Sequence, residues 1–425
     1  MRVDWCSHEA LHYSRVLLRN STLAFTTITG ASGAPTTYTG TDGVDLITLV
    51  NPGATDLRAD GADDFIGVNF TAATGTATSV SLRGGQGIDT FQFTGVAGGT
   101  LVSSFIAGNL GNDQMFTTGT GALLTSSTVQ GGQGNDAITI AGTNGGSLIN
   151  GNLGDDTLLL TAGTFTSSSI FGGQGNDSIT TTNASVIAGV SIDGAIGNDT
   201  ITLGTLAAGS NGITLSGGSG DDVINAAAVN TAVALYIDGG IGNDTLTDGS
   251  GNSTINGGEG LDFITGGAGN DTVTGGAGPD RFILLAGANA TAGAVNTANG
   301  IDVITDFSIL EDTISLSGLL ANAIAFQQVV VGTTTASVAN VMVATPNQTS
   351  GGVALGAADV DLMNAGLQGT NDQRGFTIFS NNGVVQLWYD ADLDTANGAA
   401  DVTLVATLSN LAAAQLTQIT AGNFV

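Results

Sequence analysis

The chain has 425 residues, 67 of them Gly and only 5 % aromatic, so it lacks the bulky side chains that fill ordinary globular cores. Its acidic residues are 33 Asp and 3 Glu, against seven Arg and no Lys, and the formal net charge is -29. This composition excludes a lysine-based active site and a basic nucleic-acid interface. It favours binding of divalent cations and opposes binding to anionic membranes.

The first 21 residues differ in composition from the rest, and we expect them to form a leader outside the main fold. Residues 8–12 read HEALH and match the HExxH motif of zinc proteases. The chain has no third His, and Leu18 stands where such proteases carry one, so we expect no catalysis. The segment also lacks the apolar core of a secretory signal peptide, and the single Cys6 excludes an internal disulfide.

From about residue 22 to residue 300 a Gly-rich loop ending in Asp recurs, as in RGGQGIDT around Asp89 and FGGQGNDS around Asp177. Glycine permits left-handed turns, and Asp is a common turn residue. The step between loops is mostly 18 to 26 residues and then drops to 9. We read the loop-closing residues as Asp45, Asp63, Asp89, Asp113, Asp136, Asp156, Asp177, Asp199, Asp222, Asp244, Asp262, Asp271 and Asp280.

Apolar residues stand at fixed offsets on both sides of these loops, as Leu82 and Phe91 do around Asp89. Such offsets indicate two short strands per period of about 22 residues, each with one inward face. The pattern predicts an all-β fold, a right-handed parallel β-solenoid (β-roll) over residues 22–300, whose coils stack ~4.8 Å apart.

Stacking the loops places one carboxylate per coil along an edge, and the mutual repulsion of these carboxylates opposes folding unless a cation neutralises them. Asp oxygens and the carbonyl oxygens of Gly turns are hard ligands of the kind that Ca²⁺ takes in flexible geometry. We therefore expect multiple calcium ions on this edge. A metal-free Gly-rich turn is the alternative.

Residues 301–425 lack the repeat, and we expect a smaller capping domain there. Within it, FTIFSNNGVVQLWYDAD predicts a hairpin around Asn381 and Gly383. The acids of DADLDTANGAAD, residues 390–401, have EF-hand-like spacing, but Thr395 replaces the Gly that such a loop needs, and a solvated turn is expected.

The pattern GGxGxD, followed two positions later by an apolar residue, resembles the RTX or haemolysin-type calcium-binding nonapeptide repeat between about Arg83 and Phe282. The resemblance implies a parallel β-roll in which each Ca²⁺ lies between loops one coil apart on the same edge. The metal-site residues that it implies are Gly85, Gly87, Asp89, Gly111, Asp113, Gly132, Gly134, Asp136, Gly154, Asp156, Gly173, Gly175, Asp177, Gly197, Asp199, Gly218, Gly220, Asp222, Gly240, Gly242, Asp244, Gly258, Gly260, Asp262, Gly267, Gly269, Asp271, Gly276, Gly278 and Asp280.

The chain departs from this family pattern in two ways. Only Asp262, Asp271 and Asp280 keep the nine-residue spacing, so Asp271 alone is expected on the second edge, without a stacked partner. Elsewhere calcium is expected along one edge only. The second Gly of three loops is replaced by Asn109, Asn152 and Ala195, and Ala tolerates a left-handed turn poorly.

DVITDFSILEDTISLSGL and LWYDADLDTANGAADVTLVATL resemble the C-terminal part of secreted RTX proteins. The resemblance implies export by the type I secretion machinery of a Gram-negative-type bacterium and folding on calcium outside the cell. We expect a secreted, extracellular, non-enzymatic protein that is structural or surface-associated, through self-assembly or contact with a cell surface. The alternatives are a secreted RTX effector or zinc metalloprotease remnant carrying HEALH, and a carbohydrate-binding adhesion module.

Overall fold

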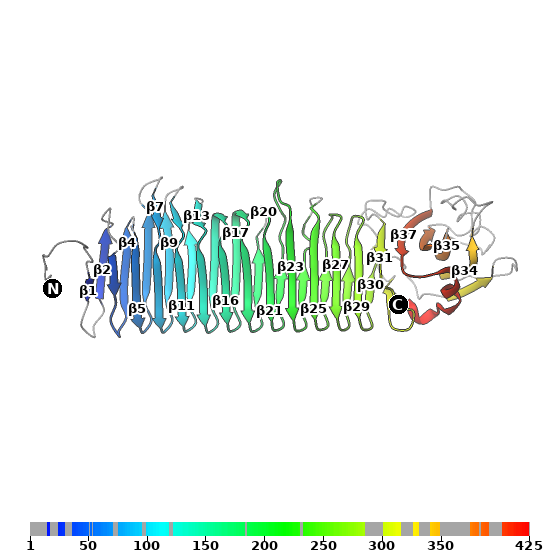
Figure 1. The fold of residues 1–425 in the computed structure, drawn as a ribbon, viewed down its shortest axis with the longest axis horizontal. Coiled ribbons are helices and arrows are strands. Elements are labelled where there is room, and N and C mark those ends of the chain that lie inside the picture. Colours follow the sequence, from blue (N-terminus) through cyan, green and yellow to red (C-terminus); the bar gives the residue numbers. More distant parts are fainter. Residues whose placement is uncertain are drawn as a thin grey trace. The chain divides into compact units, whose positions relative to one another are not determined.

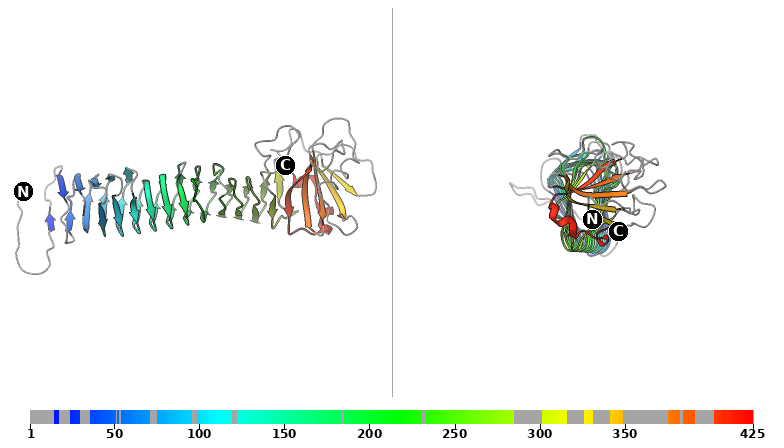
Figure 2. Two further views of the ribbon diagram at one scale, coloured as in Figure 1. Left: turned by 90° about the horizontal axis from the view of Figure 1, so that it is seen from above. Right: turned by 90° about the vertical axis from the view of Figure 1, so that its right-hand side faces the viewer.

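Each Gly-Asp loop turns the chain from a strand of one sheet into a strand of a second sheet, so the backbone winds in coils. The computed structural model describes residues 15–17, 24–29, 36–50, 52, 54–70, 75–95, 99–118, 122–182, 185–229, 233–284, 301–315, 326–330, 341–348, 375–381, 384–390 and 402–424. The chain divides into two compact units, residues 1–219 and 220–425. Within each unit, parallel strands stack side by side as a β-solenoid (Figures 1 and 2).

The first unit consists of two parallel sheets joined at two edges. One sheet contains β1 (Arg15–Leu17) and the strands that lead into the Gly-Asp loops, which are β3 (Thr36–Thr39), β5 (Thr55–Gly61), β8 (Ser81–Gln86), β11 (Phe105–Leu110), β14 (Thr128–Gln133), β16 (Leu148–Leu153), β18 (Ser169–Gln174), β21 (Ser191–Ile196) and β23 (Ile213–Ser219). The other sheet contains β2 (Ala24–Thr29), β4 (Asp45–Val50), β6 (Phe65–Phe70), β7 (Thr76–Thr78), β9 (Thr90–Gly95), β10 (Thr100–Val102), β12 (Gln114–Thr118), β13 (Ala122–Thr125), β15 (Ala137–Gly145), β17 (Thr157–Thr166), β19 (Ser178–Thr181), β20 (Val186–Ala188) and β22 (Thr200–Thr202).

The second unit begins with the same two-sheet arrangement and ends in an antiparallel part. Its coils contain β24 (Val223–Asn225), β25 (Leu235–Ile241), β26 (Thr245–Thr247), β27 (Thr254–Glu259), β28 (Phe263–Thr265), β29 (Thr272–Ala277), β30 (Arg281–Ile283), β31 (Asp302–Ile304) and β32 (Thr313–Ser315). They are followed by β33 (Phe326–Val330), β34 (Val341–Gln348), β35 (Gly375–Asn381), β36 (Val384–Asp390), β37 (Val402–Leu408) and the 3₁₀ turns η2 (Ala413–Gln418) and η3 (Ala421–Asn423).

The core of each unit is a narrow ladder of aliphatic side chains held in register by strand pairing. In the first unit Ile170 of β18 pairs with Ile192 of β21, and Ile179 of β19 pairs with Ile201 of β22. All four are at most 1 % exposed. Each coil therefore buries apolar surface only against its neighbours, so a single coil would have no core of its own. The predicted fold class, an all-β parallel solenoid, is confirmed.

Coil length differs between the units. Successive ladder Asp residues in the first unit are 19 to 25 residues apart, whereas Asp244, Asp262 and Asp280 in the second unit are 18 apart. The longer coils carry additional short strands such as β10 and β13 on the side away from the Gly-Asp loops. The spacing between successive Gly-Asp loops therefore varies because the opposite edge of the coil varies in length.

The segment after residue 300 continues the coil geometry before the fold changes. Strands β31 and β32 pair in parallel with β29 and β30, so residues 301–315 add one further coil to the second unit. The predicted hairpin is present, because β35 and β36 are antiparallel with Asn381 opposite Val384. The HEALH segment and residues 391–401 lie outside the described residues. In the described part of the chain no helix is long and apolar enough to cross a membrane.

Positive φ angles set the shape of every loop. All the Gly residues predicted for the metal sites have φ between +84° and +139°. Asn109, Asn152 and Ala195 take the second-Gly position of their loops with φ of 83°, 81° and 83°. Asn adopts this region readily, but the Cβ of Ala makes it unfavourable. The loop of Ala195 therefore keeps the common geometry at a local energetic cost.

Replacing Ala195 by Gly should remove that cost and stabilise the protein by about 1 kcal/mol. The midpoint of thermal unfolding in a fixed buffer measures the effect. Ala137→Gly is the matched control, because Ala137 is exposed in β15 and has no positive φ. That control should lose about 0.5–1 kcal/mol. A destabilised Ala195→Gly variant would contradict the interpretation that Ala195 is strained by its positive φ.

Candidate metal sites along the loop edge

The loop-closing Asp residues form a continuous hydrogen-bonded column in each unit, which we call the Asp ladder. The backbone N–H of each Asp donates to Oδ1 of the Asp one coil later, as Asp156 does to Asp177 at 2.7 Å. The other bonds are 2.7 to 3.1 Å long. The ladder runs through Asp45, Asp64, Asp89, Asp113, Asp136, Asp156, Asp177 and Asp199 in the first unit, and through Asp222, Asp244, Asp262, Asp280 and Asp312 in the second.

One loop-closing residue was predicted wrongly. Asp64, rather than Asp63, accepts the N–H of Asp45 and is 2 % exposed. Asp63 lies at the outer surface of the loop, where its Oδ1 accepts the N–H of Ile88. The sequence DD in this loop allows both alignments, and the buried residue after the loop is Ile66.

In nine ladder residues the second carboxylate oxygen is buried without a hydrogen-bond partner. Every ladder side chain is at most 3 % exposed, and Oδ1 accepts the ladder hydrogen bond. Oδ2 lies buried and makes no hydrogen bond in Asp64, Asp89, Asp113, Asp136, Asp156, Asp177, Asp244, Asp262 and Asp280. A buried carboxylate oxygen without a donor is costly, so this row of oxygens indicates a missing positive partner.

The first ladder residue of the first unit and the last ladder residue of the second unit differ from these nine residues. In Asp45, Oδ2 accepts the N–H of Thr41, and in Asp312 Oδ2 accepts the N–H of Ser308. Both donors lie four residues before the Asp in its own loop. At the ends, local backbone thus satisfies the oxygen that the interior loops leave without a donor.

A carbonyl oxygen of the next coil faces the same space as Oδ2. A Cβ built on Gly172, the first Gly of its loop, would collide with Oδ2 of Asp177 and with the carbonyl oxygen of Gly194. The same two kinds of oxygen surround Gly84, Gly108, Gly131, Gly151, Gly239 and Gly257. Only Gly fits there, and each interior loop brings a carboxylate and a carbonyl from adjacent coils together. Both are hard-oxygen ligands suited to Ca²⁺.

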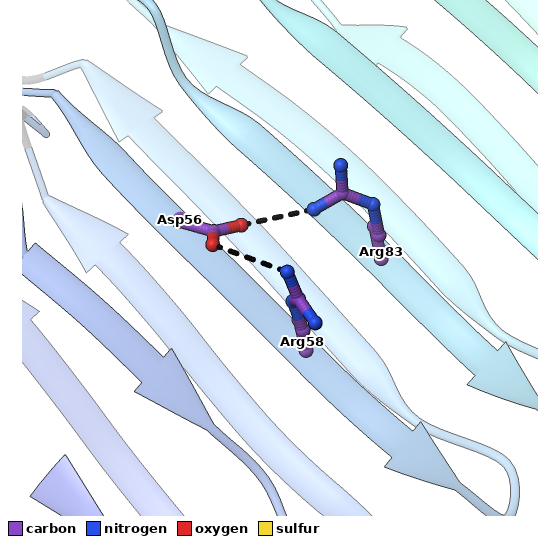
Figure 3. Close-up of polar contacts among 3 residues, drawn as sticks. All are labelled: Asp56, Arg58 and Arg83. Atoms are coloured by element: carbon purple, nitrogen blue, oxygen red, sulfur yellow. Dashed lines mark hydrogen bonds and ion pairs between the residues drawn. The ribbon is translucent and has the colours of Figure 1, made fainter. Parts of the chain in front are cut away.

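No positive side chain neutralises this column among the described residues. The ion pairs of the described residues lie away from the Asp ladder. They join Arg83 and Arg58 to Asp56, at 3.0 and 3.7 Å, on the outer face of β5 and β8 (Figure 3). Arg83 also lies over the ring of Phe105, 5.2 Å from its centre. No three His, Cys, Asp or Glu side chains of the described part gather as a metal group. Any cation on the ladder must therefore draw much of its coordination from backbone carbonyls.

Burial makes the ladder carboxylates reluctant to ionise. It raises the pKa of Asp89, Asp136 and Asp177 from 3.8 to about 7, and that of Asp113 and Asp156 to about 6. The ladder hydrogen bond lowers each pKa only in part. Repulsion between neighbouring carboxylates adds to the rise at Asp89 and Asp177. A proton or a cation would relieve the same electrostatic cost.

A second column of loop side chains was missed in the sequence. Where Asn or Asp precedes the ladder Asp, that residue lies at the exposed surface and its side chain accepts an N–H from the next coil, as Asp155 accepts that of Asn176 at 2.7 Å. Asn112, Asn135, Asn176 and Asp221 do the same. This outer column runs in the opposite hydrogen-bonding sense to the Asp ladder. The repeated Asn or Asp at the fifth loop position could have predicted this column from the sequence. Both residue types are also common in turns, so the repetition has a second explanation.

The second edge of the first unit is uncharged. Ser104, Ser127, Ser147 and Ser168 form a buried ladder in which the N–H of one residue donates to Oγ of the next, at 3.1 to 3.2 Å. The expectation that Asp271 stands without a stacked partner on this edge of the second unit is wrong. Its N–H donates to Oδ1 of Asp302 at 3.1 Å, because residues 301–315 form a further coil.

The metal-free protein should be most stable in acid. The folded pKa values of about 6 to 7 exceed the ordinary value of 3.8, so the contribution of these groups to stability is complete below about pH 4 and is lost as the pH rises through about 6 to 7. Thermal unfolding midpoints of metal-stripped protein, measured from about pH 4 to pH 8, test this. A midpoint that rises over this range would contradict it, and Asp136→Asn should flatten the curve.

Comparison with known proteins gives one family. The model of the RTX calcium-binding nonapeptide repeat (4 copies) matches residues 166–183, 209–230, 238–273, 247–282 and 257–290. No curated protein matches the chain. The matches include the loops of Asp177, Asp222, Asp244, Asp262, Asp271 and Asp280, whereas the Asp ladder also extends through loops outside them. The chain is a β-solenoid that carries haemolysin-type RTX calcium-binding repeats.

Proposed function

We propose that this protein is a secreted, structural calcium-binding solenoid that folds when Ca²⁺ occupies the loop edge outside the cell. The observation that carries the proposal is the row of buried Oδ2 atoms without donors, seven of which face a Gly carbonyl of the next coil, at Asp89, Asp113, Asp136, Asp156, Asp177, Asp244 and Asp262. Six consecutive layers of the first unit, from Asp89 to Asp199, repeat one arrangement of Gly and Asp, and so do the layers of Asp222, Asp244, Asp262 and Asp280 in the second. The predicted loop Asp and Gly residues are the proposed calcium ligands.

The residues fit the ion because each loop offers oxygens and no competing cation. Oδ1 is already held by the preceding coil, which fixes the carboxylate and directs Oδ2 toward the following coil. Calcium would supply positive charge between two coils and would link a carboxylate of one to a carbonyl of the next. In its absence the buried carboxylates must take up protons or the coils must separate, since their pKa values are raised to about 6 to 7.

This arrangement supports folding after export. A net charge of -29 keeps a calcium-free chain expanded, because the loop carboxylates repel one another. Binding energy of a metal that only the folded state can hold is folding energy. The C-terminal segments that resemble those of secreted RTX proteins provide the proposed route through type I secretion. The proposed division is a solenoid that includes β1 and the coil of residues 301–315, preceded by a leader and followed by a capping and secretion region that extends to residue 425.

A structural role is favoured over catalysis by the nature of the loop edge. Its polar groups are Asp, Asn and Gly backbone that hydrogen-bond from coil to coil, and each ladder carboxylate is buried. A buried carboxylate that is fixed between two coils has no path to a substrate. Ordered repetition of one site along a column suits a scaffold at a cell surface or in a matrix.

Calcium titration of chelated protein followed by circular dichroism tests the proposal. We expect little β signal without metal and a cooperative gain near millimolar Ca²⁺, the range of extracellular modules. Mg²⁺ should be a poor substitute, because it requires a stricter octahedron and gives up its water reluctantly. A chelated protein that is already fully folded at neutral pH would rule out the switch.

Two adjacent carboxylates provide a matched pair of variants. Asp156→Asn should raise the calcium midpoint several-fold, because it keeps the Oδ1 acceptor but replaces the buried Oδ2 by a donor. Asp155→Asn makes the same charge change one residue earlier, in the exposed outer column where Asn135 and Asn176 already stand. It should leave the midpoint nearly unchanged. Equal shifts in the two variants would mean that net charge alone sets the response.

A further inference from the structure

The outward side chains of the Gly-Asp loops form an exposed strip in the first unit. In each loop the third and fifth residues are exposed, as Leu153 and Asp155 are, while the sixth is the buried ladder Asp. Figure 1 shows these loops as an even row of short turns at one edge of the unit. The exposed residues of six consecutive loops, which we call the loop strip, are Gln86, Ile88, Leu110, Asn112, Gln133, Asn135, Leu153, Asp155, Gln174, Asn176, Ile196 and Asn198.

The loop strip is nearly neutral, although the chain has a formal net charge of -29. Asp155 is the one charged side chain in the strip, whose other members are Gln, Asn, Leu and Ile. A partner attracted by acidic charge would find little to bind here. A second copy of the chain carries the same net charge, so this strip is where it meets the least repulsion.

Apolar and amide side chains alternate along the third loop position. Strand pairing places Leu110, Gln133, Leu153, Gln174 and Ile196 in direct register on successive coils. The three apolar side chains are 41 %, 40 % and 55 % exposed. They recur on every second coil, ~9.6 Å apart. This regular spacing distinguishes them from the single apolar residues that any protein surface carries.

The order of these side chains reads the same in both directions from Leu153. Leu110 and Ile196 lie two coils to either side of it, and one Gln lies between each of them and Leu153. The fifth position has the same symmetry, because two Asn residues flank Asp155 on each side. A two-fold axis through this coil would therefore place apolar groups on apolar groups and amides on amides. Such self-complementarity is what a two-fold interface requires.

The loop strip is held in place before any partner binds. Oδ1 of Asn135 accepts the N–H of Asp155 at 3.1 Å, and Oδ1 of Asp155 accepts that of Asn176 at 2.7 Å. The backbone of the third position is fixed as well, since the carbonyl of Gln174 accepts the N–H of Gly154 at 2.8 Å. This preorganisation reduces the entropy that is lost when the strip is covered.

We propose that two copies of this chain associate through the loop strip, antiparallel and related by a two-fold axis at Leu153. Leu153 then contacts Leu153 of the second copy, and Leu110 contacts Ile196 of the second copy. Five coils span only ~19 Å, and the two Asp155 carboxylates repel each other near the axis, so the association is weak and reversible. The inference rests on the proposed structural function and deepens it, because it names the partner for self-assembly.

Sedimentation velocity in CaCl₂ tests this inference. Wild type should dimerise as its concentration rises from about 1 μM to about 1 mM, the range of weak complexes. Leu153→Gln should raise the dissociation constant at least about tenfold, because it removes the central apolar contact. The variant should fold, since Gln already takes this position in both adjacent coils. Leu310→Gln is the matched control, because Leu310 is 92 % exposed in the second unit and outside the strip, and it should dimerise as wild type does.

Cysteine substitutions test the geometry. In a Cys6→Ser background, Leu153→Cys should form a disulfide-linked homodimer on air oxidation, because the residue faces its own copy at the axis. Leu110→Cys alone should stay unlinked, but it should form a mixed disulfide with Ile196→Cys when the two variants are combined. Leu110→Cys that links to itself would overturn the antiparallel arrangement.

The outcomes separate this inference from the proposed function. A wild type that folds with calcium and is monomeric at every concentration overturns the inference alone. Equal weakening by Leu153→Gln and Leu310→Gln also overturns it, because association would then not depend on the strip. A wild type that binds no calcium overturns the proposed function, and sedimentation of the folded protein still decides the association.

Discussion

The buried carboxylate at each loop is the constraint on which the rest of the fold depends. In the interior layers a backbone N–H holds one oxygen of the ladder Asp, as Asp156 does for Asp177, and the second oxygen faces a carbonyl of the next coil. Like charges in adjacent layers, only ~4.8 Å apart, repel strongly when water is excluded. The aliphatic core of a coil is thin, so it cannot offset this repulsion alone. The electrostatic balance at the loop edge therefore determines whether the coils stack, and strand pairing depends on that stacking.

The two edges of a coil differ in their side chains and in how much variation in coil length they allow. The Gly-Asp edge has one geometry, enforced by first-position glycines that have no space for a Cβ and by positive φ at the second and fourth positions. The other edge of the first unit contains a neutral serine ladder, and the coil length in this unit varies between 19 and 25 residues. Length variation is tolerated where no carboxylate must be placed. In the second unit the coil shortens to 18 residues, and carboxylates occupy both edges.

The sequence was sufficient for the fold class and the column of loop Asp residues, because both depend on local, repeated chemistry. Apolar residues at fixed offsets specify strands, and Gly at fixed offsets specifies left-handed turns. Other features could be identified only from the three-dimensional structure. Asp63 and Asp64 are adjacent, so only burial shows which one joins the ladder. Asp302 follows a long interruption, so its place above Asp271 appears only through strand pairing. Ala195 shows that a poor residue can be forced into a turn by coils on its two sides.

The direction of the Asp ladder also determines how the layers are coupled. Each carboxylate belongs to three coils, because Oδ1 bonds to the coil before, the chain passes through its own coil, and Oδ2 faces a carbonyl of the coil after. A cation at Oδ2 therefore stabilises an interface between coils and does little for a coil alone. In a stack whose stability is a sum of repeat and interface terms, such binding raises cooperativity. The end residues Asp45 and Asp312, whose second oxygen is satisfied by Thr41 and Ser308, have no need of such an ion. Metal dependence is thus a property of the interior layers of each unit.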